Sequence, residues 1–437
     1  MSSSLGSVVL AGGGTAGHVN PLLAVADELR ERNPGAVVTG GSLGAQSLNE
    51  AVSGAAREVL ATGAQVLHLT GRGKADAVRA AVAGLEGYDV REYLAEMHLA
   101  YAVADHVVCR SGAGTVSELA ALGIPAVYVP LPRRPSGEWV ALPGKLKSAV
   151  EAAGAVIDET RAEVVVGFGG YVSTPAYLAA HRRGVPIVIH EQNARPGLAN
   201  RAGARWAEYV AVTFDGTPLK GGIVTGLPLR WEIADLIRDR SVDAATVRTN
   251  AAASLGLDPA RPTVVVTGGS LGAQSVNEAF AGAARAVLAT GAQVLHLTGK
   301  GKADAVREVV GGLPGYDVRE YLSAMHLAYA VADLVVCRSG AGTVSELAAL
   351  GIPAVYVPLP IGNGEQRLNA APLVRAGGGI LVDDEAFTSA WVTTNLPGLV
   401  SDAERLRTMA ALASRAGMQD ATARVADLVE KAAGVSR

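Results

Sequence analysis

Short runs of β-branched residues alternate with Ala- and Leu-rich amphipathic stretches along most of the chain. At the start, SVVLA (7–11) predicts a strand, GGGTAGH (12–18) a turn and VNPLLAVADELRER (19–32) a helix. Later, EVVVGF (163–168) and PIVIH (186–190) predict strands on either side of a helix over YVSTPAYLAAHR (171–182). Apolar strands that alternate with helices are typical of parallel sheets, because crossover helices bury both faces of the sheet. The pattern therefore predicts an α/β fold.

The chain also contains a long internal repeat. Thr39–Pro132 aligns with Thr267–Pro360 over 94 positions without a gap, and only twelve positions differ. The stretch CRSGAGTVSELAALGIPAVYVPLP occurs unchanged in both copies. Each copy predicts almost one half of a doubly wound sheet, and two copies of this length do not make a solenoid. The flanks differ after the repeat, which indicates that copy one (39–132) is a transplant of the later segment into an earlier domain.

Composition narrows the class of protein. With 437 residues, 49% of them hydrophobic and 18% charged, the chain can form two or three domains and is not disordered. A net charge of −3 gives no sign of a nucleic-acid partner. We expect Cys109 and Cys337 to be reduced, buried residues at strand ends. No apolar run reaches membrane-spanning length and the N-terminus does not resemble a signal peptide, so we expect a cytoplasmic protein.

Three glycine-rich turns follow predicted strands and open predicted helices. They are Gly12–Gly17, Gly268–Gly272 and Ser339–Gly342, and copy one repeats the last two at 40–44 and 111–114. Such a turn lets backbone N–H groups converge on an anion at the positive end of a helix. Each turn alone is a weak signal, because a tight strand–helix connection without a ligand gives the same pattern.

Glu346 and His18 each allow two interpretations. Thr343 and Glu346 have the S/T-x-x-E spacing of a capping box, in which both side chains satisfy free helix N–H groups. The alternative for Glu346 is a carboxylate that accepts hydrogen bonds from ribose hydroxyls, and Glu118 poses the same choice in copy one. His18 is either structural or a neutral base at a helix N-terminus, where the helix dipole disfavours its protonation.

The sequence contains no spacing typical of a metal site, so we expect none. The segment RRPSGEWVALPGKLK (133–147) places basic residues around an apolar, Trp-bearing stretch. It predicts either a solvated loop or a patch that binds the headgroups of an anionic membrane. The residues of this patch are Arg133, Arg134, Trp139, Val140, Leu142, Lys145 and Lys147.

Taken together, seven stretches in order resemble the MurG family, bacterial transferases that add N-acetylglucosamine to lipid I to make lipid II. They are GGGTAGHVNPLLAVA (12–26), GFGGYVSTP (167–175), HEQNARPGLANR (190–201), VTGLPLR (224–230), GGSLGAQSVNE (268–278), CRSGAGTVSELAALGIPAVYVPLP (337–360) and GEQRLNA (364–370). The resemblance implies a GT-B fold, with two Rossmann-like domains that face each other across a cleft, and copy one would add an extra Rossmann-like lobe.

The resemblance also implies domain bounds. The acceptor domain would comprise 1–38 and 133–226, the inserted copy 39–132 and the UDP-sugar domain 227–410. Residues 411–437 would form a helix that packs back on the N-terminal domain. Copy one lacks counterparts of GEQRLNA and of the Arg230 stretch, so we expect copy two to be the working donor site.

Carried over residue by residue, the resemblance implies a donor site for UDP-N-acetylglucosamine. Arg230 and Ser270 would contact the diphosphate, Leu322 the uracil through its backbone, and Glu346 the ribose. Gln366 would bind sugar hydroxyls, as would Glu365 less certainly, since the family often has Gln there. The phosphate turn would consist of Ala341, Gly342, Thr343, Val344 and Ser345. Thr15, Ala16 and Gly17 would meet donor or acceptor phosphates, and the cleft would be lined by His18, Tyr171, Glu191, Asn193 and Asn277.

The implied reaction is an inverting transfer of N-acetylglucosamine to the 4-hydroxyl of an undecaprenyl-linked MurNAc-pentapeptide, without a metal or other cofactor. His18 is the first candidate base and Glu191 the second. The protein would act at the cytoplasmic face of the plasma membrane as a peripheral protein, in peptidoglycan synthesis and hence in cell shape and cell division. Two alternatives stay open: a nucleotide-sugar-binding relative inactivated by the insertion, and a GT-B transferase with another lipid or glycoside acceptor.

Overall fold

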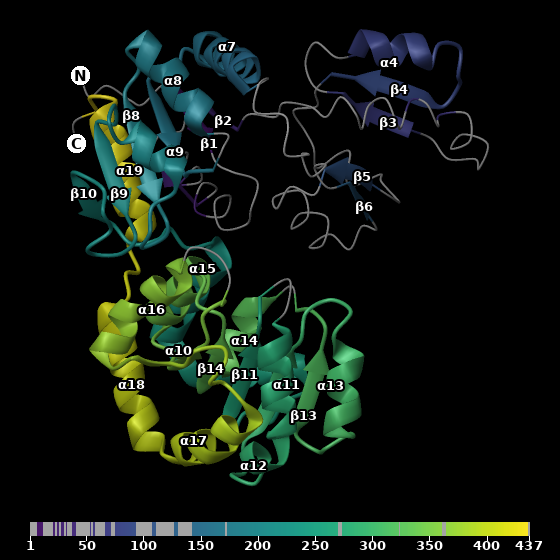
Figure 1. The fold of residues 1–437 in the computed structure, drawn as a ribbon, viewed down its shortest axis with the longest axis vertical. Helices are drawn as coiled ribbons and strands as arrows, with labels where there is room; N and C mark the ends of the chain where they lie inside the picture. Colours follow the sequence, from purple (N-terminus) through teal and green to yellow (C-terminus); the bar gives the residue numbers. More distant parts are fainter. Residues whose placement is uncertain are drawn as a thin grey trace.

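The structure of the protein is a computed structural model with two α/β domains joined by a short linker (Figure 1). It describes residues 7–11, 21, 24–25, 28–29, 32, 37–40, 53, 56, 66–70, 75–92, 107–110, 126–129, 142–170, 173–269, 273–322, 324–360 and 364–435. None of the helices in these ranges is long and apolar enough to cross a membrane.

The N-terminal domain is built on a six-stranded parallel sheet with the order β10-β9-β8-β7-β1-β2. Every residue of β7 and β8 is buried, as the apolar runs VVV of β7 and IVI of β8 predict for strands covered on both faces. The strands are β1 (Ser7–Ala11), β2 (Val37–Gly40), β7 (Val164–Gly167), β8 (Ile187–Glu191), β9 (Tyr209–Val212) and β10 (Gly222–Val224), and the helices are α7 (Leu142–Thr160), α8 (Ser173–Arg183) and α9 (Leu198–Gly203). The predicted bounds of β1 are confirmed, and those of β7, α8 and β8 hold to within two residues.

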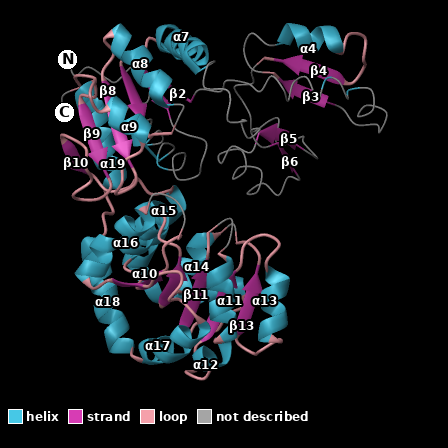
Figure 2. Ribbon diagram, in the orientation of Figure 1, coloured by secondary structure: helices cyan, strands magenta, loops and turns pink. Residues whose placement is uncertain are grey.

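The C-terminal domain has a second six-stranded parallel sheet, in the order β13-β12-β11-β14-β15-β16. Helices cover both of its faces (Figure 2). Its strands are β11 (Thr263–Thr267), β12 (Gln293–Leu297), β13 (Tyr316–Arg319), β14 (Leu334–Cys337), β15 (Ala354–Tyr356) and β16 (Gly379–Leu381). Its helices are α10 (Trp231–Leu255), α11 (Gln274–Gly282), α12 (Ala284–Leu288), α13 (Ala303–Val310), α14 (Met325–Val331), α15 (Ala341–Leu350), α16 (Glu365–Ala376), α17 (Ser389–Ser401) and α18 (Ala403–Ala416).

Both sheets have a point where the strand order reverses. In the C-terminal sheet the chain moves outward from β11 to β12 and β13, and then returns to the other side of β11 with β14. In the N-terminal sheet the corresponding neighbours are β1 and β7. Ligands of doubly wound sheets bind outside the carboxyl ends of the strands at this point. The motifs after β7, β11 and β14 therefore lie where this rule predicts a ligand.

The end of the chain returns to the N-terminal domain, where α19 (Ala421–Ala432) lies beside β8 and β9 (Figure 1). Val425 and Val429 share an apolar cluster with Val164 of β7. Arg32 adds a polar contact, because its guanidinium donates to the Asp427 carboxylate over 2.5 Å. The last helix thus packs back on the N-terminal domain, and it starts beside the linker, where a Cβ at Gly226 would meet Met418 and Ala421.

Copy one pairs its strands differently from copy two. In copy two, β11 pairs with β12 on one side and β14 on the other. The matching strand of copy one is β2, which pairs with β1 of the N-terminal sheet. The remaining described strands of copy one form two pairs that keep the registers of copy two. The first pair is β3 (Val66–Leu69) with β4 (Tyr88–Arg91), connected by α4 (Ala75–Ala81). The second pair is β5 (Val107–Arg110) with β6 (Ala126–Val129).

The expected extra Rossmann-like lobe therefore does not form as one sheet within the described ranges. The β3–β4 and β5–β6 pairs are two separate two-stranded sheets there. The physical reason is that the strand that would join them, β2, is already part of the N-terminal sheet. Copy one thus supplies an edge strand to the N-terminal domain while its other described strands stay outside that sheet.

Several of the twelve differences between the copies fall in the core of copy two. Phe280, Val276 and Leu334 are fully buried there, and copy one has Val52, Leu48 and His106 at these positions. Val in place of Phe leaves volume unfilled, and His in place of a buried Leu brings a polar ring into an apolar site. Copy two is therefore the better sequence for the core of the C-terminal domain.

We predict that the copy-one residue weakens the C-terminal domain when it is placed in copy two. Phe280→Val removes several buried carbon atoms and should cost about 2–3 kcal/mol, which lowers the domain's thermal transition by roughly 5–10 °C. The matched control is Lys300→Arg, also a copy-one residue, at an exposed position. Differential scanning calorimetry measures the thermal transition of each variant. Equal transition temperatures for the two variants would contradict the conclusion that copy two is the better sequence for this core.

Candidate functional site

The candidate site begins where β14 ends and α15 starts. Arg338 follows β14 and fixes this end of the strand, because its Nη1 donates to the Asp384 carboxylate over 2.5 Å and to the Pro358 carbonyl over 3.0 Å. Its Nη2 donates to Ser275 Oγ over 2.9 Å. This buried network joins β14 to the start of α11 and to the segment after β16. The turn at Ser339 and Gly340 therefore leaves the sheet from a fixed position.

The N-terminus of α15 has no described side chain packed against it. Gly340 is the N-cap, with a φ of −62°, and no side chain caps the helix. A Cβ added at Gly340 or Gly342 would meet no atom of the described residues within 4 Å. Neither backbone strain nor packing thus calls for glycine at 340. The hydroxyl of Ser339 is buried in this turn and has no hydrogen-bond partner among the residues that the structure describes. Free N–H groups, open space and an unpaired hydroxyl suit an anion.

The capping-box interpretation of Glu346 is wrong. Because Gly340 is the N-cap, Thr343 lies at the third and Glu346 at the sixth position of α15. Glu346 instead binds Arg230, 116 residues earlier: Arg230 Nε donates to Oε1 over 2.8 Å and Nη2 donates to Oε2 over 3.2 Å. The side chains are 24% and 13% exposed, so this is a largely desolvated, two-pronged ion pair. The third residue at this pair is Tyr329 of α14, which sequence reasoning missed.

The electrostatics of this group are consistent with a fixed arrangement of charges. Burial raises the pKa of the Tyr329 hydroxyl, and the Glu346 carboxylate raises it further while Arg230 opposes the shift. Tyr329 therefore stays protonated. Burial alone would lower the pKa of Arg230, but the neighbouring Glu346 carboxylate outweighs it and the net pKa is raised. Arg230 keeps its charge, and its Nη1 is not used in the pair with Glu346.

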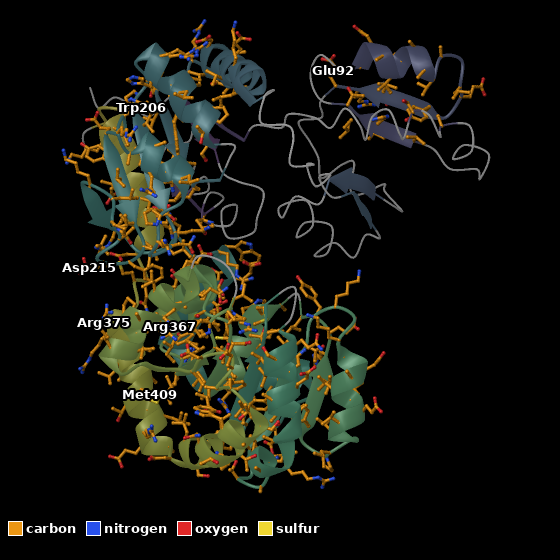
Figure 3. The ribbon with its side chains drawn as sticks, viewed as in Figure 1. Glu92, Trp206, Asp215, Arg367, Arg375 and Met409 are labelled. Atoms are coloured by element: carbon orange, nitrogen blue, oxygen red, sulfur yellow. The ribbon has the colours of Figure 1, made fainter. Side chains whose placement is uncertain are left out.

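Helix α16 supplies the third part of the site. Glu365, Gln366 and Asn369 lie on one face of the helix, because residues three and four apart are neighbours. Gln366 Oε1 accepts a hydrogen bond from the Leu359 backbone over 3.0 Å, so its amino group is the end that can donate to a ligand. In Figure 3 the labelled Arg367 and Arg375 mark this helix, on the side of the C-terminal domain toward the N-terminal domain. Sequence reasoning quoted Asn369 within GEQRLNA but gave it no role.

Across from α16, Glu191 organises the loop after β8. Its Oε1 accepts from the Asn193 backbone over 3.0 Å, and its Oε2 accepts from the Gly197 backbone over 3.0 Å and from Asn200 Nδ2 over 2.9 Å. Glu191 is 3% exposed, and burial raises its pKa while these donors oppose the shift. The negative charge of Glu365 on α16 raises its pKa too. Because both oxygens are occupied, the geometry favours an anchor for the loop over a general base.

The structure corrects the expectation that Asn277 lines the cleft. Asn277 on α11 is 3% exposed. Its Nδ2 donates to the Thr298 carbonyl over 2.9 Å, and its Oδ1 lies 3.0 Å from His296 Nε2. Both ends of the amide are used inside the C-terminal domain, so no donor or acceptor faces the cleft. Burial lowers the pKa of His296 to about 3, so the ring is neutral and can donate from Nε2 to Asn277.

The remaining expected site residues divide into two groups. Leu322 lies just before α14, half-buried against the core of the C-terminal domain. Ala341 and Val344 are buried, whereas Gly342, Thr343 and Ser345 are half-buried in the first turns of α15. The calls that lie outside the described residues are Thr15, Ala16, Gly17, His18, Tyr171, Ser270, Arg133, Arg134, Trp139 and Val140, together with the side chains of Leu142 and Lys145.

Within the described ranges, no group of three or more His, Cys, Asp or Glu side chains could hold a metal ion. Because this covers only part of the chain, the expectation that the protein uses no metal stays a prediction. Cys337 is free and buried as expected, and burial raises its thiol pKa. The side chain of Cys109 is outside the described part of the chain.

Comparison with known proteins gives near full-length relatives. A protein of Nocardioides sp. is 46% identical over 97% of both chains, and one of Frankia casuarinae is 45% identical over 99% of this chain and 97% of its own. A third, from Paenarthrobacter aurescens, is 44% identical over 98% and 96%. All three are named UDP-N-acetylglucosamine–N-acetylmuramyl-(pentapeptide) pyrophosphoryl-undecaprenol N-acetylglucosamine transferase.

Solved structures support the same fold. The MurG of Acinetobacter baumannii matches with a TM-score of 0.63 and 25% identity, over 98% of this chain and 99% of its own. A UDP-GlcNAc 2-epimerase from Neisseria meningitidis bound to UDP-GlcNAc matches at 0.60 over 97% and 100%, but at 12% identity it shows the GT-B-like fold alone.

Family models match both parts of the chain. The glycosyltransferase family 28 N-terminal domain matches residues 8–63, and the family 28 C-terminal domain matches residues 263–425 and also 36–140, which contains copy one. With these matches and relatives above 40% identity over nearly its whole length, the chain belongs to glycosyltransferase family 28 and, within it, to the MurG family of N-acetylglucosaminyltransferases.

Proposed function

We propose that the protein transfers N-acetylglucosamine from UDP-N-acetylglucosamine to the 4-hydroxyl of an undecaprenyl-pyrophosphoryl MurNAc-pentapeptide, with inversion at the anomeric carbon. The observation that carries the proposal is the group at the start of α15. It combines an uncapped helix N-terminus, open space above Gly340 and Gly342, and the pair of Arg230 and Glu346. An anion and a diol are the two chemical groups that a nucleoside diphosphate would present there.

The chemistry follows from the charges that develop during transfer. As the glycosidic bond to UDP breaks, negative charge grows on the departing diphosphate. The N–H groups of α15 and Nη1 of Arg230, which takes no part in the pair with Glu346, would stabilise that charge, and they need no reorganisation because the structure already fixes them. Gln366 would hold the sugar hydroxyls through its amino group. No metal is needed in this proposal.

The attacking hydroxyl needs a base on the acceptor side. We keep His18 as that base, because it follows the glycine-rich turn at the carboxyl end of β1, next to β7 at the reversal point of the N-terminal sheet. Glu191 would shape the loop that carries Asn193 instead of taking the proton. The relatives are named as transferases to a pyrophosphoryl-undecaprenol acceptor, which supports the choice of a lipid-linked acceptor.

A lipid-linked acceptor requires contact with a membrane surface. The basic segment 133–147 runs into α7, where Leu146 is 39% exposed and the Lys147 side chain 77% exposed. An exposed apolar residue beside a basic one suits the headgroup region of an anionic bilayer. We propose that this end of α7 and the segment before it bind the cytoplasmic face of the plasma membrane peripherally.

The central test measures transfer from labelled UDP-N-acetylglucosamine to a lipid I analogue. Glu346→Ala leaves the Arg230 charge unpaired and removes the acceptor for ribose hydroxyls, so we expect kcat/KM to fall roughly 10–100-fold. The matched control is Glu118→Ala, the same residue in copy one, which should stay within about twofold. A larger loss from Glu118→Ala would reverse the choice of copy, and UDP binding without any product from the wild type would favour the binding-protein alternative.

For the base, we predict that His18→Ala lowers kcat by about 10²–10⁴-fold while UDP affinity is retained. The measurement is a single-turnover transfer assay, accompanied by calorimetric titration with UDP. A fall in UDP affinity with an unchanged kcat would instead assign His18 to donor binding.

For the membrane surface, we predict that charge reversal of Arg133, Arg134, Lys145 and Lys147 weakens binding to phosphatidylglycerol vesicles roughly 10²-fold or more. The matched control reverses four basic residues of the C-terminal domain, Arg285, Lys300, Lys302 and Arg307. Sedimentation with vesicles measures both variants. Equal binding by the two would remove segment 133–147 from the membrane contact.

A further inference from the structure

Asn369 connects the two domains through a single side chain. It lies on α16 of the C-terminal domain and is fully buried. Its Oδ1 accepts a hydrogen bond from the Ala194 backbone of the N-terminal domain over 2.9 Å. Its Nδ2 donates to Asn193 Oδ1 over 3.3 Å and to the Ser339 carbonyl over 3.4 Å. One amide thus contacts the loop after β8 and the turn before α15 at the same time.

The orientation of these amides follows from one unambiguous donor. A backbone N–H can only donate, so the atom of Asn369 that faces Ala194 must be its oxygen. The other end of Asn369 is then its amino group, which agrees with the Ser339 carbonyl as an acceptor. The amino group in turn requires the oxygen of Asn193 to face it. The flip of both amides is therefore fixed by the network and not by local geometry.

This chain of bonds has a consequence for the cleft. With its oxygen directed to Asn369, Asn193 presents its amino group, which has no hydrogen bond to any described residue. The backbone around it is held separately, because Glu191 accepts from the N–H groups of Asn193 and Gly197. The loop is thus fixed to its own domain by Glu191 and to the donor domain by Asn369.

We infer that Asn369 is a positioning residue that sets Asn193 as a hydrogen-bond donor toward the substrate and fixes the acceptor-domain loop relative to the donor turn at Ser339. The role rests on the proposed transferase function. This role needs all three bonds together. The bond from Ala194 sets the distance between the domains, and the bond to Asn193 Oδ1 leaves the Asn193 amino group for the cleft. The bond to the Ser339 carbonyl fixes the Asn369 amide relative to the start of α15. The bond from the amino group to Asn193 Oδ1, which crosses between the domains, is longer than the usual 2.9–3.0 Å, so a small closure of the domains would strengthen it.

The first test reads the contact directly, without activity. In Asn369→Ala, the amide of Ala194 loses its acceptor, and we expect its hydrogen exchange, resolved by residue, to speed up about tenfold or more. The matched control is Asn395→Ala, an exposed Asn of α17 whose amino group binds the Trp391 carbonyl within one helix. It should leave exchange at Ala194 unchanged. Faster exchange confined to α16 in Asn369→Ala would overturn the inference, because a merely structural residue acts on its own helix.

The second test separates positioning from donor binding. Asn369→Ala should lower kcat roughly 10–100-fold with UDP affinity within about threefold. Asn369→Asp keeps an acceptor for Ala194 but turns Asn193 around, since a carboxylate accepts where the amide donated, and it repels the Ser339 carbonyl. We therefore expect Asn369→Asp at pH 8 to transfer more slowly than Asn369→Ala, although it is closer in shape. The reverse order, or an unchanged kcat in both, would refute the role.

The two tests fail independently. If the wild type makes no product, the transferase proposal fails, and the exchange measurement still decides whether Asn369 holds the loop. If the wild type is active and exchange at Ala194 does not change in Asn369→Ala, the function stands and the positioning role is wrong.

Discussion

Where the strand order of a parallel sheet reverses, the crossover helices leave a crevice outside the carboxyl ends of two neighbouring strands. The candidate site of this protein depends on that constraint. In the C-terminal domain the position lies between β11 and β14, and in the N-terminal domain between β1 and β7. The strands end there at the same edge, so the turns that follow them converge without any specific contact between their sequences. The uncapped start of α15 belongs to this edge, and its free N–H groups gain from the helix dipole there.

At this position, two oppositely charged side chains from distant parts of the sequence form an ion pair. Arg230 precedes α10, directly after the linker, and Glu346 lies on α15, yet the two form a desolvated two-pronged pair. Removing two charges from water is costly, and such a pair is weak evidence for stability alone. Its value lies in geometry, because the planar guanidinium and the carboxylate fix each other's orientation and leave one guanidinium nitrogen outside the pair. In a similar way, the Asn369 amide fixes the orientation of the groups that it binds where the two domains meet.

The repeat shows how far tertiary context overrides sequence. Copy one and copy two share all but twelve of 94 positions, and the β3–β4 pair keeps the register of β12–β13. Yet β2 pairs with β1, whereas its counterpart β11 lies between β12 and β14. The neighbours that each copy meets in its own domain, and not its sequence alone, therefore decide which sheet the strand joins. The buried Phe280 and Leu334, replaced in copy one by Val52 and His106, add a reason why copy two builds the donor domain.

The sequence by itself determined the alternation of strands and helices, the bounds of β1, the glycine-rich turns and the family to which the chain is similar, because these depend on residues close together in the chain. Tertiary structure alone decided which polar side chains meet. Thr343 and Glu346 have the spacing of a capping box, but the helix begins at Ala341, and Glu346 binds a residue 116 positions away. Asn277 is used in the core, and Asn369 meets Ala194 across 175 positions. Local periodicity predicts elements because each is held by its own backbone, whereas hydrogen-bond partners this distant in sequence are set only once the sheets are packed.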